Sequence, residues 1–303
     1  MSSLTRVRQK RDRKPVIAIA YDGERTEAEY FDGWRRILGP RGLVLKPFYV
    51  RSGGNPRVAV DETCKKAATD KDYDRLWCVC DVDDASPADV AAAKKKASQR
   101  GIELILSVRC FEVWLALHWG RSAGPVQCEE DAVNLVRRHH ATYDASRKSL
   151  PFSLLLPRTA DACTNAVWLK GQGHDNPWTD VHYLVALLRW RTIYHMCRRD
   201  EWAAAQSVGS YAGSSQDAAD GFIHFSTAAQ VVESAAKHRA GQDGLLLLAV
   251  EAAALGEALK WEPSRGGQLF PHLYGPLPLR AVAAIHDLPL GGDGRHVFPP
   301  LED

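Results

Sequence analysis

The sequence predicts an α/β protein of two domains, a doubly wound and mostly parallel sheet followed by a smaller α+β domain. The chain has 303 residues, which is long for a single hydrophobic core. Apolar, β-rich runs alternate with helical patterns over residues 15–119, as a parallel sheet with crossover helices requires. Beyond residue 190 the chain becomes rich in Gly, Ala and Leu, with frequent Gly-containing turns. The predicted division is a basic arm at 1–14, a first domain at 15–190 and a second at 191–303.

The elements of the first domain are expected in a regular order. The expected strands are 15–23, 43–50, 74–80 and 102–108, and the expected helices are 26–38, 56–70, 86–101 and 110–119. The third strand is continuously apolar, which is typical of a strand buried on both faces. Ser86 is the expected N-cap of its helix, with Pro87 at the first helical position and Gly101 at the end. A closing helix is expected within residues 176–190, and a new strand begins near 191.

The overall charge does not identify a partner, because 39 basic and 37 acidic residues leave a net charge of +2. One segment, in contrast, is strongly basic. RVRQKRDRK, at residues 6–14, holds six basic residues and one acidic residue. This segment is either a solvated, frayed terminus or an arm that contacts the phosphates of a nucleic acid.

Several features indicate the compartment. No apolar run approaches the roughly 20 residues that a membrane span needs, and the N-terminus lacks the apolar segment of a secretory signal. The seven cysteines are odd in number and include no CxxC spacing, which does not suit a disulfide framework. We therefore expect a cytoplasmic protein without membrane contact. The sequence leaves open whether the chain forms oligomers.

Acidic side chains follow three of the expected strands. Glu24 follows the first strand, Asp81 and Asp83 follow the third, and Glu112 follows the fourth. Because α/β sheets bind ligands beyond the carboxyl ends of their strands, we expect these acids to converge on one edge. Aspartates at positions i and i+2 of a strand point toward the same face, so Asp81 and Asp83 could approach one cation.

Converging carboxylates favour a hard cation such as Mg²⁺, or Mn²⁺ in its place. Asp81 and Asp83 would then be the ligands and Glu24 a general base for phosphodiester hydrolysis. The alternative for DVDD is a solvated turn in which Asp84 is an additional cap, because this motif alone is weak. The alternative for Glu112 is an acid favoured by the N-terminal end of its helix.

The first domain resembles a known family. The motifs that carry the resemblance are VIAIAYDGERTEAEYF, SGGNP, LWCVCDVDD, CFEVWLALHW and NPWTDVHYLV. In order and spacing they resemble the RloB (AbiLii-like) family, whose domain is related to the Toprim fold of topoisomerases, primases and nucleases. The resemblance implies a Toprim-like sheet and a Mg²⁺-dependent, nuclease-like effector of a phage-defence or restriction-associated system.

The same resemblance implies roles for individual residues. Glu24 would be the acid–base residue, Asp81 and Asp83 the metal ligands, Glu112 a further acid, and Glu27 a helper one helical turn after Glu24. The pairs Tyr21-Asp22 and Val108-Arg109 depart from the residues that we expect before the family's GE and CFE motifs. Neither departure removes an expected ligand.

The expected substrate is a nucleic acid. Arg109, Arg137 and Arg138 are the candidate contacts to its backbone; the alternatives are an Arg109–Glu112 surface pair and a solvated helical face at 137–138. No RNA-recognition signature or zinc module decides between DNA and RNA. The family resemblance also implies a separate ATPase partner. This chain contains no GxxxxGK[ST] phosphate loop, so any ATP dependence must come from another protein.

The second domain carries polar residues that suit a pocket. They are His195, His224, Ser226, Thr227, Glu262, Arg265, His272 and Tyr274. The segments RTIYHM, DAADGFIHFSTAAQV, LLLLAVEAAAL and LKWEPSRGGQLFPHLYGPLPL resemble domain-of-unknown-function family 952 over residues 192–300. That family is related in fold to ADP-ribosyltransferases and RNA 2′-phosphotransferases, so the resemblance implies an NAD or ADP-ribose pocket.

In such a pocket His195 would hold the nicotinamide ribose, Tyr274 would stack on the ring, and Glu262 or His272 would lie beside the anomeric carbon. Arg265 would meet the pyrophosphate as a bidentate donor.

Simpler structural roles are the alternatives for three of these residues. The pair Ser226-Thr227 could cap the helix that follows it, and His224 could be a hydrogen-bonded core histidine.

Three functional hypotheses follow. The first is a metal-dependent nuclease acting through the first domain. The second is an ADP-ribosyl or RNA 2′-phosphate transferase acting through the second domain. The third makes the second domain a non-catalytic ligand sensor that gates the nuclease.

Overall fold

The computed structural model describes residues 14–40, 42–143 and 149–302. They form two compact units, one of residues 14–40, 42–112, 126–143 and 149–154, and one of residues 113–125 and 155–302. The boundary predicted near residue 190 stays a prediction. Helices that precede it pack in the second unit, where Trp190 stacks on Trp261 with ring centroids 4.7 Å apart. The basic arm lies outside the described residues except for Lys14.

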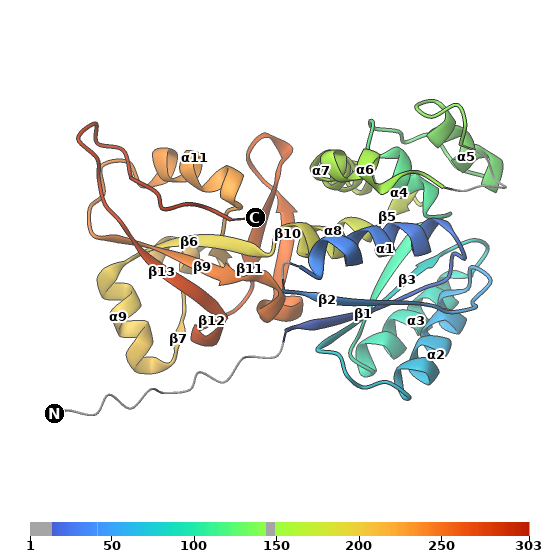
Figure 1. The fold of residues 1–303 in the computed structure, drawn as a ribbon, viewed down its shortest axis with the longest axis horizontal. Helices are drawn as coiled ribbons and strands as arrows, with labels where there is room; N and C mark the ends of the chain where they lie inside the picture. The colour runs from blue at the N-terminus through green and yellow to red at the C-terminus, as the bar shows by residue number, and fades with distance from the viewer. Residues whose placement is uncertain (1–13, 41, 144–148, 303) are drawn as a thin grey trace. The chain divides into compact units, whose positions relative to one another are not determined.

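The first unit contains the predicted parallel sheet. Its strands are β1 (Val16–Tyr21), β2 (Val44–Tyr49), β3 (Arg75–Asp81) and β4 (Ile102–Val108). They lie in the order β2-β1-β3-β4, and every pairing among them is parallel. Helix α1 covers one face of the sheet, and α2 and α3 cover the other (Figure 1). The predicted doubly wound arrangement is therefore confirmed.

Helices connect the strands and continue the chain beyond them. Their bounds are α1 (Thr26–Leu38), α2 (Pro56–Ala67), α3 (Pro87–Gln99), α4 (Glu112–Ala116), α5 (Glu129–Arg137) and α6 (Phe152–Leu155). The cap predicted for α3 is confirmed, because the Ser86 hydroxyl accepts a hydrogen bond from the Asp89 N–H at 3.1 Å. Asn55 caps α2 in the same way and so fixes where the preceding SGG loop ends.

An aromatic cluster fills the core between α1 and the segments that follow β4. Tyr30, Phe31 and Trp34 of α1 are almost fully buried. Phe111 and Phe152 meet them edge-on, with Tyr30–Phe111 centroids 5.4 Å apart and Trp34–Phe152 centroids 5.4 Å apart. This packing holds the middle of α1 against the segments that follow β4.

The second unit is built on antiparallel sheets. The strands of these sheets are β6 (Thr192–Arg198), β7 (Ser210–Tyr211), β8 (Ile223–His224), β9 (Leu245–Glu251), β10 (Leu259–Pro263), β11 (Leu269–Leu273), β12 (Leu277–Pro278) and β13 (Val282–Leu288). The two-residue strand β5 (Trp178–Thr179) is not part of them. The sheet orders are β13-β9-β6, β10-β11-β8 and β12-β7. A bridge between Tyr194 and Ser226 holds β6 beside the chain that leaves β8. The predicted antiparallel α+β character is confirmed.

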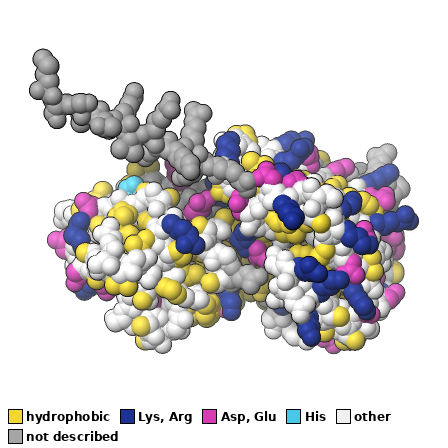
Figure 2. Space-filling model, turned by 90° about the horizontal axis from the view of Figure 1, so that it is seen from below, with side chains coloured by type: hydrophobic (Ala, Val, Ile, Leu, Met, Phe, Trp, Pro, Cys, Tyr) yellow, Lys and Arg dark blue, Asp and Glu magenta, His cyan; other side chains and the backbone are white. Residues whose placement is uncertain are grey.

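Helices of the second unit cover these sheets. They are α7 (Thr159–Gly171), α8 (Val181–Arg189), α9 (Arg199–Val208), α10 (Ser215–Asp220) and α11 (Ala228–His238), with 3₁₀ turns η1 (Leu156–Arg158), η2 (Ala252–Ala258), η3 (Arg265–Gly267) and η4 (Leu279–Ala281). Among the described residues, no helix combines the length and apolar character needed to cross a membrane. Basic and acidic side chains both occur on the face seen in Figure 2.

Gly33 in α1 allows a direct test of the aromatic core. A Cβ at this position would lie 2.3 Å from the Phe152 ring. Helix propensity alone favours Ala over Gly by about 1 kcal/mol, whereas overpacking a core costs about 1–3 kcal/mol. We expect Gly33→Ala to lower the free energy of unfolding, measured by chemical denaturation, and Gly33→Ala/Phe152→Leu to recover part of the loss. A stabilised single variant would contradict this packing.

Candidate functional site

A cavity of about 610 Å³ opens at the carboxyl ends of the parallel strands in the first unit. Acidic side chains from β3, from the turns after β1 and β3, and from α1, α4 and α5 line it, together with the SGG loop that follows β2. The acids are Asp22, Glu24, Glu27, Asp81, Asp83, Glu112 and Glu129. The predicted convergence of acids on one edge of the sheet is thus present.

Three of these carboxylates form a compact group. Asp22 directly follows β1, Glu27 lies in the first turn of α1, and Asp81 is the last residue of β3. Each offers one oxygen, and these oxygens all lie within 4.8 Å of one another. Oxygen donors at this spacing fit a hard divalent cation, so Asp22, Glu27 and Asp81 are the residues that would hold Mg²⁺ or Mn²⁺.

Glycine in the turn after β1 makes room for this group. A Cβ on Gly23 would lie 1.7 Å from Glu27 Oε2, so the buried Glu27 carboxylate occupies the space that a side chain would need. This clash explains the Asp-Gly at the end of the first strand in packing terms.

The SGG loop holds the Asp22 carboxylate. The Ser52 hydroxyl donates a hydrogen bond to Asp22 Oδ2 at 2.5 Å, and it accepts one from the Gly54 N–H at 3.2 Å. The Asp81 N–H donates to Asp22 Oδ1 at 3.4 Å. These contacts fix Asp22 between β3 and the loop, although sequence reasoning treated it only as a departure from the family motif.

The electrostatics of the group favour a cation. Burial raises the pKa of Asp22 to about 6, with the nearby Asp83 charge acting in the same direction and the Ser52 hydrogen bond opposing it. Burial also raises the pKa of Asp81 well above its ordinary value, and the charges of Glu27 and Asp22 add to the effect. Burial is the largest cause of both shifts, and at Asp81 repulsion from Glu27 and Asp22 adds to it, so a bound cation would stabilise the charged forms of these carboxylates.

Asp83 and Glu24 line the same cavity outside the compact group. A Cβ on Gly54 would lie 2.0 Å from Asp83 Oδ2, so Asp83 turns toward the SGG loop. Glu24 is exposed and accepts a hydrogen bond from the Tyr49 hydroxyl at 3.4 Å. The roles predicted for these two residues stay predictions.

Glu112 is the first residue of α4, as its helix-end alternative expected, and it is buried. It accepts hydrogen bonds from the Tyr143 hydroxyl at 2.9 Å and from the Thr26 hydroxyl at 3.4 Å. The alternative of a surface pair between Arg109 and Glu112 is therefore wrong, whereas contact of Arg109 with nucleic acid stays a prediction. Arg109 pairs instead with Asp84, with Nη1 2.8 Å from Oδ1. Sequence reasoning missed Tyr143, which lies 31 residues after its partner.

Arg137 and Arg138, the other two candidate contacts to nucleic acid, differ in how far their side chains are engaged within the unit. Arg137 donates from Nε to the Tyr143 carbonyl at 2.8 Å and pairs with Glu130, so much of its hydrogen-bonding capacity is used within the unit. Arg138 follows α5 and is exposed. Contact of these residues with nucleic acid stays a prediction.

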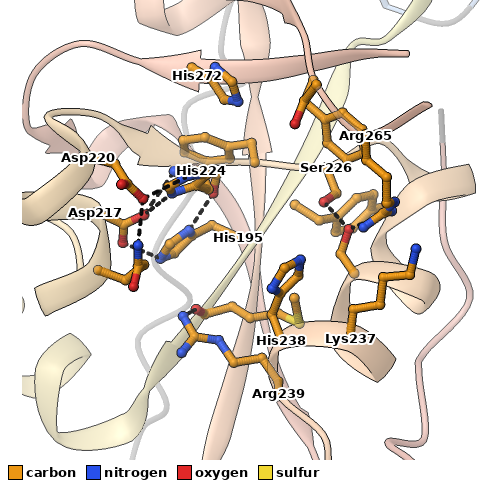
Figure 3. A pocket seen from close by; sticks show the side chains of 17 residues that line it. His195, Asp217, Asp220, His224, Ser226, Lys237, His238, Arg239, Arg265 and His272 are labelled. Atoms are coloured by element: carbon orange, nitrogen blue, oxygen red, sulfur yellow. Dashed lines mark hydrogen bonds and ion pairs between the residues drawn. The ribbon is translucent and has the colours of Figure 1, made fainter. Parts of the chain in front are cut away.

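A second cavity, of about 670 Å³, lies within the second unit. Of the predicted pocket residues, it brings together His195, His224, Ser226, Arg265 and His272. Figure 3 shows their arrangement. Glu262 and Tyr274 are not among its lining residues, although both are described; they bond to each other, with the Tyr274 hydroxyl 2.9 Å from Glu262 Oε2.

The hydrogen bonds of Ser226 and Thr227 show which of the two caps helix α11. Thr227 is the N-cap residue of α11, and its N–H donates to Gln230 Oε1 at 3.0 Å, so the capping role is confirmed. The Ser226 hydroxyl instead donates to Ser234 Oγ at 3.2 Å. An NAD or ADP-ribose ligand for this cavity stays a prediction.

The raised pKa of Asp22 predicts a pH dependence of stability in the absence of divalent cations. A pKa of about 6 in the folded state, against an ordinary value of 3.8, means that the folded protein holds the proton more tightly. The resulting stabilisation is present below about pH 4 and is lost as the pH rises through 6. We expect Asp22→Asn to remove this loss, which amounts to at most about 3 kcal/mol.

Denaturation with EDTA at pH 4 to 8 measures the effect. The difference in unfolding free energy between Asp22→Asn and wild type should move in favour of the variant as the pH rises. Asp84→Asn, at an exposed carboxyl group paired with Arg109, is the control and should show no such trend. A pH-independent difference for Asp22→Asn would contradict the assignment.

Comparisons with known proteins agree with the two-part organisation. The model of the family described as RloB-like protein matches residues 17–188, and that of Protein of unknown function (DUF952) matches residues 196–285. No curated protein matches the chain. Both family resemblances expected from the motifs are confirmed.

Solved structures of protein CC0527 from Caulobacter crescentus are also similar to part of the chain. The X-ray structure is 53% identical, covers 35% of this chain and 93% of its own, and has a TM-score of 0.34. The solution NMR structure is 53% identical, covers 35% and 90%, and has a TM-score of 0.33. Because the RloB-like model spans more than half of the 303 residues, the chain belongs to the RloB-like protein family.

Proposed function

We propose that the chain is a divalent-cation-dependent nuclease that hydrolyses phosphodiester bonds at the acidic cavity of the first unit. The observation that carries this proposal is the group of three carboxylates within 4.8 Å, two of which have raised pKa values. Asp22, Glu27 and Asp81 would hold Mg²⁺ or Mn²⁺. When bound, the cation would polarise a phosphoryl oxygen and neutralise developing negative charge.

Residues around the carboxylate group supply the remaining functions. Glu24 is exposed at the cavity, so its carboxylate can take a proton from an attacking water molecule. Arg51 is exposed on the same lining and can pair with a substrate phosphate. Tyr143 and Thr26 orient Glu112 at the inner side through their hydrogen bonds.

The biological setting is part of the proposal. Membership of the RloB-like family supports a role as an effector in phage defence or near restriction systems. The acidic cavity by itself suits any nucleic acid backbone, so DNA and RNA are both included among the substrates. A separate ATPase remains the partner that the family resemblance implies.

A cleavage assay on a mixed panel of DNA and RNA with Mg²⁺ or Mn²⁺ tests the function. We expect cleavage by the wild-type chain that EDTA stops. Asp81→Asn should lower the rate by at least about 100-fold, because even residues that only support metal ligands contribute 10- to 100-fold.

Asp84→Asn is the matched control for this assay, since Asp84 lies three residues away, with its side chain 86% exposed, and pairs with Arg109. It should cleave at close to the wild-type rate. Both variants must first show wild-type melting temperatures or better. Cleavage that survives EDTA or Asp81→Asn would contradict the proposed site.

A further inference from the structure

Two histidines on neighbouring strands line the cavity of the second unit. His224 of β8 lies opposite His272 of β11 in the antiparallel register, with ring centroids 5.6 Å apart. His224 Nδ1 lies 2.7 Å from Asp217 Oδ1, and His272 Nδ1 lies 2.8 Å from Glu262 Oε2. Because a carboxylate only accepts hydrogen bonds, each Nδ1 donates, and each ring keeps Nε2 for other contacts.

His195 has a different role in the same wall. Its Nδ1 donates to the His224 carbonyl at 2.7 Å, so its Nε2 can accept the hydrogen bond from the Tyr211 hydroxyl at 3.1 Å. Burial lowers its pKa, which keeps the ring neutral. Both nitrogens are thus used inside the unit, and His195 supports the backbone of β8.

Asp217 holds the His224 ring in place. It is almost fully buried and accepts hydrogen bonds from the Ser214 N–H at 2.7 Å and from the His224 N–H at 3.0 Å. Burial raises its pKa, but hydrogen bonds from the His224 side chain, the His224 N–H and Ser214 outweigh that effect and hold the pKa well below its ordinary value. Asp220 lies on the other side of the ring, with Oδ2 3.4 Å from His224 Nε2. This end of the cavity therefore offers hydrogen-bond acceptors to a ligand.

The opposite side of the cavity is cationic. Figure 3 shows Arg265 and Lys237 across the cavity from Asp217 and His224. The Arg265 guanidinium lies over the Phe270 ring at 5.1 Å, and its Nη2 lies 3.4 Å from both Ser234 Oγ and Glu233 Oε2. Lys237 lines the same side and pairs with the same carboxylate, with Nζ 2.7 Å from Glu233 Oε1. The two cations thus already share one exposed anion, and a phosphate, which offers more charged oxygens than a carboxylate, suits the same position.

We propose that this cavity binds a small phosphate ester that carries hydroxyl groups, such as a sugar phosphate. Its phosphate replaces the Glu233 carboxylate between Arg265 and Lys237, and its hydroxyl groups donate to Asp220 and meet His224 Nε2. The volume of about 670 Å³ lies within the usual range for small-molecule sites. The proposal goes beyond the nuclease function, because all of these residues belong to the second unit.

Isothermal titration calorimetry on the full chain tests the proposal with glucose 6-phosphate, inorganic phosphate and glucose. We expect glucose 6-phosphate to bind at least about 10-fold more tightly than either of the others, since only it engages both ends. Arg265→Gln and Lys237→Gln should each weaken its binding about 10-fold or more, the usual effect of a charge-assisted contact. Asp220→Asn should weaken glucose 6-phosphate and leave inorganic phosphate unchanged.

Arg280→Gln is the matched control, because Arg280 is exposed in η4 and does not line the cavity. It should bind like wild type, and so should Asp81→Asn, whose defect would be confined to nucleic acid cleavage. Melting temperatures establish that each variant is folded. The proposal is overturned if neither phosphate compound binds at millimolar concentration, or if Arg265→Gln and Lys237→Gln bind glucose 6-phosphate as tightly as Arg280→Gln does.

Discussion

The repulsion among three crowded carboxylates is the constraint on which the first unit depends. Asp22, Glu27 and Asp81 come from three different elements, yet their oxygens share a space less than 5 Å across. Removing one such charge from water costs several kcal/mol unless a proton or a cation compensates it. The fold must therefore contribute enough stability elsewhere to hold the group together, and the aromatic core beneath α1 is one source.

The carboxylates of this site determine which residues the surrounding loops can contain. Gly23 and Gly54 stand where any side chain would overlap the carboxylates of Glu27 and Asp83. Ser52 then gives Asp22 a hydrogen-bond donor from the same loop. Short loops at the ends of parallel strands thus do two things at once, because they reverse the chain and fix the direction of an acid. A site preorganised in this way does not have to rearrange when a cation arrives.

The order of strands and helices was predictable, because apolar runs such as LWCVC and cap residues such as Ser86 carry local signals. The edge of the sheet that holds the acids was predictable for the same reason. The membership of the compact carboxylate group was not. The i, i+2 argument for Asp81 and Asp83 holds only inside a strand, and β3 ends at Asp81, after which the chain turns toward Gly54.

Contacts between distant segments account for the rest of the difference. The Tyr143–Glu112 hydrogen bond and the Ser52–Asp22 hydrogen bond join residues 31 and 30 positions apart, and no spacing in the sequence indicates them. Glu27 had a weaker signal, since a residue one turn after Glu24 on the expected helix could face the same edge. In the second unit, the pairing of His224 with His272 depends on a strand register that the sequence does not reveal.

Direct measurement of Mn²⁺ binding to the full chain tests the central claim, that the carboxylate group of the first unit is a cation site. Titration calorimetry should show Mn²⁺ binding to the wild-type chain that Mg²⁺ competes for and that Glu27→Gln abolishes, with Glu129→Gln, at another acid lining the cavity, retaining it. Wild-type Mn²⁺ binding by Glu27→Gln, or no binding by the wild-type chain, would contradict the account.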